Sequence, residues 1–443
     1  MIEVRCFGSL AEAAFLRDEV NALNRVSTRP DPFSTFEFFE NYLRHDEAFP
    51  QGQGLHLWFL AALEAGRLVG YMALKRVTHS AMGLRAAKLD FLVTHDADRP
   101  QLVARPQDAR AVSEAFYAYL LERRREWGFL EFRQQDAASP LFPPPAAIKL
   151  KGYWVRQWPS LDNGTIHVRW GTLDSYFRSF SSKFRSNVSR QMRSLLAAGD
   201  VEYLASSDPA TTPVLFELYQ SIEKRSWKSG AGVAIGRNPL WLAYFKDPHD
   251  VRHPMRLAIH VLLLDGMPVA GLITGAFEQG LYALHMVFDN SLSRLSPGSA
   301  VLLMGMRQAI DGRYAFVNLL SGFGYYKVRW HAQMAETRNA QIYRIGTPFF
   351  WRRLLGDMKR WVLPADAQRS AMHFNPARRD VVENYDEPLD VGRLNPRLSA
   401  GERARVAGLS AQVREGRGEF LSASELAALM PFATQRPAPS RNR

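Results

Sequence analysis

The chain has 443 residues, which is long for a single domain, and its 47% apolar and 12% aromatic content is typical of a globular protein with a core. The 56 Lys and Arg against 44 Asp and Glu give a formal charge of +12, which favours anionic partners such as nucleotides, nucleic acid or acidic lipid. A single cysteine, Cys6, excludes an internal disulfide and a cysteine-based metal site. No apolar run reaches the ~20 residues that cross a bilayer, and the N-terminus lacks a signal-peptide pattern, so we expect a cytosolic protein.

Two stretches of the chain repeat the same pattern. Residues 56–77 and 256–277 each contain an apolar strand, an acidic residue, a glycine turn and a second apolar strand, which predicts two β-hairpins. Gly66 corresponds to Gly266, and Glu64 corresponds roughly to Asp265. In both copies a further strand, a helix and another strand follow in the same order. The sequence therefore predicts a duplicated α/β domain.

Composition indicates where the copies end. Prolines around "SPLFPPP" predict a boundary, with a first domain over 1–150 and a second over 160–346. Residues 347–443 then form an extension. Its first part, "TPFFWRRLLGDMKRWV", predicts an amphipathic basic helix, and two further helical stretches precede a C-terminal end that we expect to be disordered. The amphipathic helix either docks on its own protein or lies on an anionic membrane face.

Several stretches together resemble a known group of enzymes. They are "SKFRSNVSRQMRSLLAAGD", "EKRSWK", "LLLDGMPVAGLIT", "RLSPGSAVLLMGM" and "GFGYYKVRW", which span roughly residues 180 to 345. In order and spacing they are similar to the acetyltransferases associated with cellulose and exopolysaccharide biosynthesis. That group consists of tandem members of the GNAT superfamily and is related to the Fem-type aminoacyl transferases. The resemblance implies an α/β (α+β) fold with two tandem GNAT-like domains, each containing a mixed twisted sheet.

The resemblance also implies a binding loop for acyl-CoA. GNAT folds present backbone N–H groups at a glycine-containing helix start to the diphosphate of coenzyme A. Here "RLSPGSA" supplies the candidates, but Leu295 stands where the pattern has Arg or Gln. The alternative is a Pro-Gly turn that only begins a helix. The matching stretch of the first copy, "RPQLVARPQDARAV", contains no glycine, so we expect that copy to be non-catalytic. The predicted cofactor-binding residues are Arg294, Pro297, Gly298, Ser299 and Ala300.

Four residues are candidates for catalysis. The strands "LYALHMVF" and "YAFVNLLS" should be parallel neighbours, and "GFGYYK" leaves the second of them. The resemblance implies that Tyr326 protonates the leaving thiolate and that Lys327 stabilises an oxyanion or holds a phosphate. His285 is the candidate general base because its reference pKa is near neutrality, with Asp289 as the fallback. The alternatives are a surface lysine, a core histidine and a carboxylate that caps a helix.

Arg225, Trp227 and Lys228 close a helix and are candidates for binding the acceptor, since tryptophan offers a stacking surface for a sugar ring. The alternatives are core packing for the tryptophan and compensation of the helix dipole for the two cations.

The remaining patterns indicate few other partners. The basic stretch "KFRSNVSRQMR" predicts a solvated helix or a phosphate contact, and we expect no specific nucleic acid. His249 and His253 lie in a proline-bounded loop, so we predict no metal site.

The resemblance predicts a cytoplasmic enzyme that moves an acyl group, acetyl in the first instance, from acyl-CoA to an amine or hydroxyl of a sugar or envelope precursor. A contact with the inner face of the membrane is left open. The alternatives are a transferase that uses aminoacyl-tRNA and a non-catalytic scaffold of a polysaccharide synthesis complex.

Overall fold

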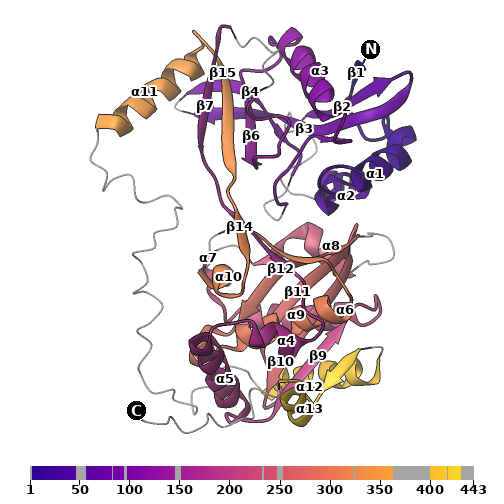
Figure 1. Ribbon diagram of the computed structural model, residues 1–443, viewed down its shortest axis with the longest axis vertical. Helices are drawn as coiled ribbons and strands as arrows, with labels where there is room; N and C mark the ends of the chain where they lie inside the picture. Colours follow the sequence, from indigo (N-terminus) through magenta and orange to yellow (C-terminus); the bar gives the residue numbers. More distant parts are fainter. Residues whose placement is uncertain are drawn as a thin grey trace. The chain divides into compact units, whose positions relative to one another are not determined.

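The computed structural model describes residues 2–45, 56–81, 83–93, 97–144, 151–231, 234–246, 253–322, 325–362, 400–416 and 418–430. By their internal contacts these residues divide into a first unit, 1–165 with 320–375, and a second unit, 166–319 with 376–443. The described residues form two eight-stranded sheets, each with parallel and antiparallel neighbours, which confirms the predicted α/β class with two mixed sheets. Figure 1 shows the elements of each unit.

The first sheet has the strand order β1-β2-β3-β4-β6-β15-β7, and β5 pairs with β3. Its neighbours are antiparallel except for β4 and β6, which are parallel. The strands are β1 (Ile2–Phe7), β2 (His56–Glu64), β3 (Arg67–Ala81), β4 (Leu84–Phe91), β5 (Val103–Ala104), β6 (Phe129–Gln135), β7 (Tyr153–Pro159) and β15 (Arg338–Arg344).

Helices cover both faces of this sheet. Gly70 faces Val112 of α3, and the next residue along β3, Tyr71, donates a hydrogen bond from its hydroxyl to the carbonyl of Ser34 on the other face. Helix α11 packs on β4 and β15 through Phe349 and Phe350. The helices of the first unit are α1 (Arg17–Arg25), α2 (Phe36–His45), α3 (Ala109–Glu122), α10 (Tyr325–Arg329) and α11 (Pro348–Val362), with 3-10 turns η1 (Ala14–Leu16) and η2 (Pro32–Ser34).

The second sheet has the order β14-β8-β13-β12-β11-β10-β9-β16. Strands β12 and β13 are parallel neighbours, as the sequence predicts. The strands are β8 (Asn163–His167), β9 (Val201–Ser206), β10 (Arg256–Leu264), β11 (Met267–Phe277), β12 (Gly280–Phe288), β13 (Phe316–Ser321), β14 (Gln333–Ala335) and β16 (Glu419–Leu421).

Helices α6 and α9 cover opposite faces of the second sheet. Gly271 of β11 faces Tyr219 of α6, while the adjacent Leu272 meets Gly305 of α9. The helices of this unit are α4 (Leu173–Arg178), α5 (Ser182–Leu196), α6 (Thr212–Glu223), α7 (Trp227–Ala231), α8 (Pro239–Lys246), α9 (Pro297–Asp311), α12 (Ala400–Glu415) and α13 (Ala423–Leu429), with 3-10 turns η3 (Ile235–Arg237) and η4 (Asn290–Leu295).

The two predicted hairpins share their irregularities as well as their strands. The register of β2 and β3 shifts at Leu63, and that of β10 and β11 shifts at Leu263, so the same position of each hairpin carries a bulge. Gly66 and Gly266 both have positive φ, as do the residues before them. The predicted repeat is therefore confirmed down to the turn, except that Asp265 corresponds to Ala65 and not to Glu64.

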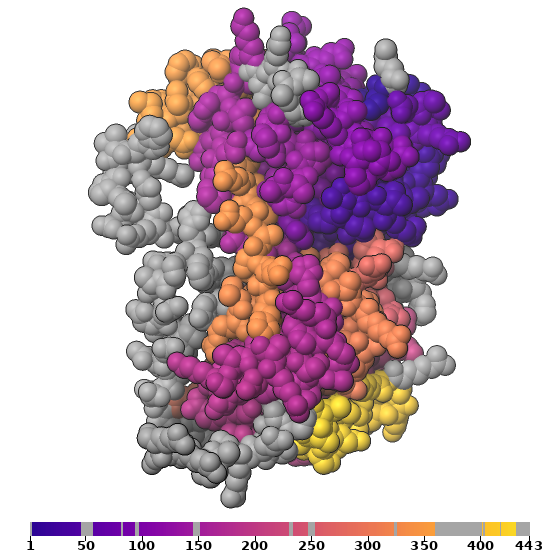
Figure 2. Space-filling view, in the orientation of Figure 1, coloured from indigo at the N-terminus to yellow at the C-terminus, as the bar shows by residue number. Residues whose placement is uncertain are grey.

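The C-terminal extension contributes elements to the second unit. Strand β16 pairs antiparallel with β9, and α12 packs against α6. Val413 and Leu426 are buried, and the guanidinium of Arg307 lies 2.5 Å from the carboxylate of Glu419. Figure 2 shows residues 400–430, in yellow, against the surface of this unit. Two of the predicted helical stretches are thus confirmed, while the C-terminal end at 434–443 lies outside the described residues.

The predicted range 160–346 does not coincide with the second unit. Strand β15 pairs on one side with β6 and on the other with β7, so residues after 319 join the first sheet before the chain reaches α11. This placement of β15 depends on pairing between strands about two hundred residues apart in the sequence. The hydrophobic pattern within one segment cannot predict such pairing.

Candidate active site

The parallel strands β12 and β13 separate after a short ladder. Their register runs from Gly280 opposite Phe316 to Tyr282 opposite Asn318, and residues 283–288 of β12 continue beyond it. A bulge contributes to this, because Ile273 pairs with His285 while the next residue of β11 pairs with Ala283. The extra residue bends β12 where it leaves β13. The resemblance to GNAT enzymes implies such a separation, which would admit the acyl carrier.

Helix α9 begins beside the end of β12. Its N-cap residue, Ser296, is in the left-handed region with φ 50°, and its side chain makes no cap hydrogen bond. The helix is fifteen residues long, so its N-terminal end carries a partial positive charge that favours an anion. A Cβ added to Gly298 would lie 3.1 Å from the ring of Phe288. A side chain here would press on Phe288, so glycine allows the start of α9 to pack closely on the end of β12.

The residue that departs from the GNAT pattern has a packing role. Leu295 is buried, with 7% of its surface exposed, and it ends the turn η4. Arg294, one position earlier, is half-buried. Pro297 and Ala300 are buried, while Ser299 is half-buried and its N–H donates to the carbonyl of Ser296 at 2.9 Å. The predicted loop is thus one continuous turn and helix start.

His285 and Asp289 lie in different surroundings on β12 and just after it. The His285 ring meets Trp241 of α8 edge-on, with ring centroids 5.0 Å apart. Asp289 is buried and caps η4, accepting hydrogen bonds from the N–H of Ser291 at 3.0 Å and from its hydroxyl at 2.6 Å. Its other carboxylate oxygen lies 2.9 Å from Nε of Arg225. Both oxygens of Asp289 are therefore engaged, as the capping alternative predicts.

The three candidates for acceptor binding separate by exposure. Arg225 ties the end of α6 to the sheet, because it donates to the carbonyl of Pro268 and pairs with Asp289. Its side chain is 10% exposed, so its geometry is that of an internal brace. Trp227 is 57% exposed, which excludes the core-packing alternative for this ring. Lys228 is half-buried.

Lys327 is buried in the first unit, with 4% of its surface exposed, so it is not a surface lysine. Its Nζ donates to the carbonyl of Leu320 at 2.7 Å. Burial lowers the pKa of Lys327 to about 8, and the negative charge of Asp98 acts in the opposite direction. Tyr326 keeps 37% of its surface exposed, but atoms packed around its hydroxyl raise its pKa to about 12. The phenol is therefore protonated at neutral pH.

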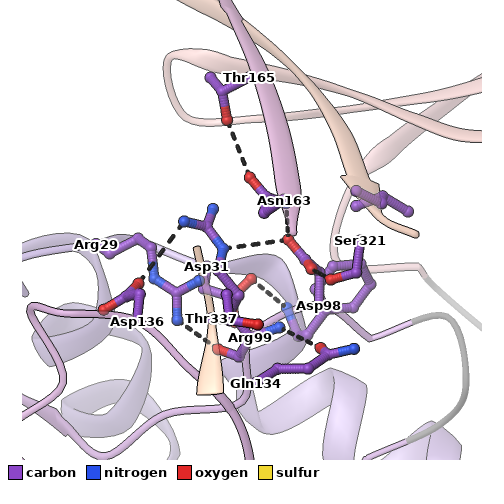
Figure 3. Close-up of polar contacts among 12 residues, drawn as sticks. Arg29, Asp31, Asp98, Arg99, Gln134, Asp136, Asn163, Thr165, Ser321 and Thr337 are labelled. Atoms are coloured by element: carbon purple, nitrogen blue, oxygen red, sulfur yellow. Dashed lines mark hydrogen bonds and ion pairs between the residues drawn. The ribbon is translucent and has the colours of Figure 1, made fainter. Parts of the chain in front are cut away.

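Asp98 is the centre of a polar cluster that the sequence analysis missed (Figure 3). This buried carboxylate accepts hydrogen bonds from the amide of Asn163 and the hydroxyl of Ser321, and it lies 3.3 Å from Nε of Arg99. Ser321 is the last residue of β13 and precedes Lys327 by six positions. The sequence signal that could have indicated Asp98 is an acidic residue that follows shortly after the predicted strand "KLDFLV". The cluster combines cations and carboxylates from distant segments.

The predicted catalytic residues thus belong to two units. Lys327 and Tyr326 lie in the first, with Asp98, whereas His285, Asp289 and the 294–300 loop lie in the second. Among the described residues, no three His, Cys, Asp or Glu side chains come close enough to hold a metal ion, and His249 lies outside these residues.

Comparison with known families gives a match that begins in the second unit and ends in the first. Residues 182–328 match the family of acetyltransferase (GNAT) domains. The matched segment contains the separated strands, the start of α9 and Lys327, so the GNAT part of the predicted resemblance is confirmed. No curated protein sequence matches the chain.

Solved structures resemble the chain in fold at low identity. FemX is 10% identical, with a TM-score of 0.50 over 76% of this chain and 97% of that one. The C-terminal domain of a putative lysylphosphatidylglycerol synthetase from Agrobacterium fabrum is 14% identical, with a TM-score of 0.46 over 82% and 100%. A tandem GNAT protein from the clavulanic acid biosynthesis pathway is 12% identical, with a TM-score of 0.42 over 78% and 99%.

Proposed function

We propose that this protein is an acyltransferase that moves an acyl group, acetyl in the first instance, from acyl-CoA to an amine or hydroxyl. The observation that carries the proposal is the separation of β12 from β13 beside an uncapped helix start, within the segment that matches GNAT domains. The first turn of α9 would bind the diphosphate through backbone N–H groups, and no metal is needed for that contact.

The chemistry requires a base for the acceptor and a place for negative charge. His285 lies on β12 close to where the strand bends, which supports its role as base, while Asp289 and Arg225 hold the end of this strand in place. Backbone N–H groups of residues 283–288 lie beyond the ladder with β13 and are candidates for oxyanion donors. The roles of Tyr326 as acid and Lys327 as charge stabiliser stay predictions.

The acceptor class follows from the sequence resemblance, which favours a sugar nucleotide, lipid-linked sugar or other envelope or exopolysaccharide precursor. The exposed ring of Trp227 supports a sugar, and the +12 formal charge supports a phosphorylated one. A cytoplasmic location with contact to the inner membrane face belongs to the same proposal. Helix α11 supports it by exposing Trp351, Leu355 and Met358 on one side. None of the described helices is long and apolar enough to span a bilayer.

Release of free coenzyme A tests the reaction class. The purified protein is incubated with acetyl-CoA and glucosamine or a nucleotide amino sugar, and the free thiol is followed with a chromogenic reagent. Because Cys6 is the only cysteine, its Cys6→Ser variant removes the protein's own signal. Thiol release that depends on the acceptor supports the proposal. Tight acetyl-CoA binding without turnover on any amine or hydroxyl would reduce it to a binding domain.

Helix α5 favours a second candidate, a transferase that uses aminoacyl-tRNA. It carries Lys183, Arg185, Arg190 and Arg193 and contains no acidic residue. An electrostatic surface of this kind suits a polyanion. Turnover with aminoacyl-tRNA by a protein that is inert with acyl-CoA would establish this candidate. The buried Leu295 favours a third, non-catalytic scaffold, which calorimetry would reveal as an absence of acetyl-CoA binding.

A further inference from the structure

An open pocket lies in the first unit where strand β1 ends. Strand β1 pairs with β2 only as far as Phe7 opposite Phe59, so the preceding part of β2, from His56 to Trp58, continues without it. The space beyond the end of β1 has a volume of about 440 Å³, which is within the range of small-molecule sites. Its lining includes Cys6, Trp58, Arg76, Tyr119, Arg123 and Glu126.

Two arginines of the lining are held by one acidic residue. Nε of Arg76 donates to the backbone carbonyl of Glu126 at 2.8 Å, and Nη1 of Arg123 lies 3.4 Å from the Glu126 carboxylate. The guanidinium of Arg123 also sits over the ring of Tyr119, 4.5 Å from its centroid. These contacts orient both guanidinium groups before any ligand arrives, which lowers the entropy cost of binding.

The charges of the lining do not balance. Two guanidinium groups face a single carboxylate, so the pocket carries one excess positive charge at neutral pH. Among the residues that the structure describes, the terminal nitrogens of Arg76 form no hydrogen bond or ion pair. A guanidinium presents its donors as a planar fork that fits the oxygens of a phosphate or carboxylate.

The lining also includes two aromatic side chains, Trp58 and Tyr119. Trp58 and Tyr119 meet edge-on with ring centroids 6.4 Å apart, and the Cys6 thiol interacts with the Tyr119 hydroxyl. Trp58 is 7% exposed and belongs to the core of the sheet, so this wall is fixed. It offers apolar surface next to the two cations, a combination that suits a compound with a flat body and an anionic group.

We propose that this pocket binds a small molecule that carries a phosphate or carboxylate group on an apolar or aromatic body. The oxyanion would lie between Arg76 and Arg123, and the body would lie against Trp58 and Tyr119. This is a separate ligand site from the acyl-CoA site proposed on α9. No covalent chemistry is assigned to it.

The only cysteine of the chain makes the site directly measurable. Cys6 lies in the lining, and because burial raises the pKa of its thiol, labelling by a thiol reagent is compared at one fixed alkaline pH. The probes are phenyl phosphate, benzoate and neutral phenol, each at constant ionic strength. At ten times the dissociation constant only about one molecule in eleven is free, so the labelling rate should fall about tenfold with a binding anion.

Substitutions test whether the protection of Cys6 from labelling comes from binding in this pocket. Arg123→Gln, whose side chain is 45% exposed and tolerates replacement, should remove most of the protection, and Arg76→Gln should do the same. Arg110→Gln is the matched control, because that arginine is 77% exposed on the same helix and pairs with Glu114 away from the pocket. A thermal-shift titration with the same probes gives a second readout.

The three probes distinguish a phosphate site from a carboxylate site, and they test whether the pocket binds anions at all. Protection by phenyl phosphate alone, or by benzoate alone, identifies which oxyanion the pocket takes, and protection by both supports the shared chemistry. Equal protection by phenol would overturn the proposal, because the cations would then contribute nothing. The proposal also fails when neither anion changes the labelling rate or the melting temperature, or when Arg123→Gln protects as the wild type does.

Discussion

The starts of helices α3 and α9 occupy the same place in the two copies of the repeat but differ in chemistry. Asp108 is the N-cap residue of α3, and its carboxylate lies 2.6 Å from Nε of Arg105. In α9 the N-cap is Ser296, and no acidic residue occurs in the first turn. Neither N-cap side chain forms a cap hydrogen bond, but the negative charge of Asp108 beside the start of α3 opposes a bound anion there. This difference favours the second copy as the one that binds an anion.

The adjoining strands differ in the same sense. Strand β4 continues only by Phe91 beyond its last pair with β6, whereas β12 continues by residues 283–288 beyond its last pair with β13. Phe91 is buried and packs against Phe132, with ring centroids 5.6 Å apart. Side chains therefore close the first copy at this point. Donor binding in the second copy alone is the simplest consequence.

The largest effect is expected from a negative charge at the start of α9. Gly298→Glu should weaken acetyl-CoA binding by about 100-fold or more, which equals about 2.7 kcal/mol, because a carboxylate would meet the diphosphate. Since a side chain at this position also presses on Phe288, Ser299→Glu provides a second variant at a half-buried position. Isothermal titration calorimetry measures both.

A control in the first copy is Gln107→Glu, in the exposed turn just before the N-cap residue of α3. It should leave acetyl-CoA affinity unchanged. Equal losses from Gln107→Glu and Ser299→Glu would remove the difference between the copies and with it the assignment of the donor site.

Lys327→Ala should lower turnover by about tenfold or more without unfolding the protein, since it removes the ammonium beside Asp98. Steady-state rates and circular dichroism check the two parts of this prediction. Arg329→Ala, in the same short helix, serves as the control and should retain turnover within about twofold of wild type. Unchanged turnover in Lys327→Ala would exclude the residue from the reaction.

Asp98→Asn should change the pH profile more than the maximal rate. Asp98 raises the pKa of Lys327, so its removal lowers that pKa from about 8. If the ammonium form is the active one, activity is present below this pKa and is lost as the pH rises through it. The falling limb should therefore move to lower pH, while Asp136→Asn, which pairs with Arg99, should leave it in place. A shift to higher pH would contradict the account.

Deletion of 400–443 should have the smallest effect on turnover and should instead change association. Strand β16 covers the edge of β9 in the second sheet, whereas the edge strand β1 of the first carries the exposed charges of Glu3 and Arg5. An apolar edge without a cover pairs with other chains. Sedimentation velocity should show oligomers of the truncated protein, and a monodisperse protein of unchanged state would show that β9 needs no cover.

Local features of the fold were predictable from sequence, and long-range ones were not. Gly66 and Gly266 mark identical turns because positive φ is a property of a few neighbouring residues. The parallel pair β12 and β13 followed from a strand-helix-strand pattern. The insertion of β15 between β6 and β7, and the contact of Asp98 with Ser321, join segments about two hundred residues apart. No periodicity records such contacts.

The residues of the candidate site likewise fall into those that a local sequence signal could indicate and those that depend on long-range contacts. Gly298 could be found because a glycine at a helix start is a local signal, although the structure explains it by the ring of Phe288. Asp98 was missed because its importance depends on Lys327, Asn163 and Ser321, which only the folded chain brings near it. The role of Arg225 in acceptor binding stays a prediction, and its buried contacts with Asp289 and Pro268 could not be read from the sequence because they join three separate segments.

Locating acetyl-CoA in a crystal structure of the complex tests the central claim most directly. The account predicts one molecule per chain, with diphosphate oxygens about 3 Å from backbone N–H groups of the first turn of α9 and the thioester arm between β12 and β13. A ligand bound at the start of α3, or a space between β12 and β13 filled by the protein's own side chains, would contradict it.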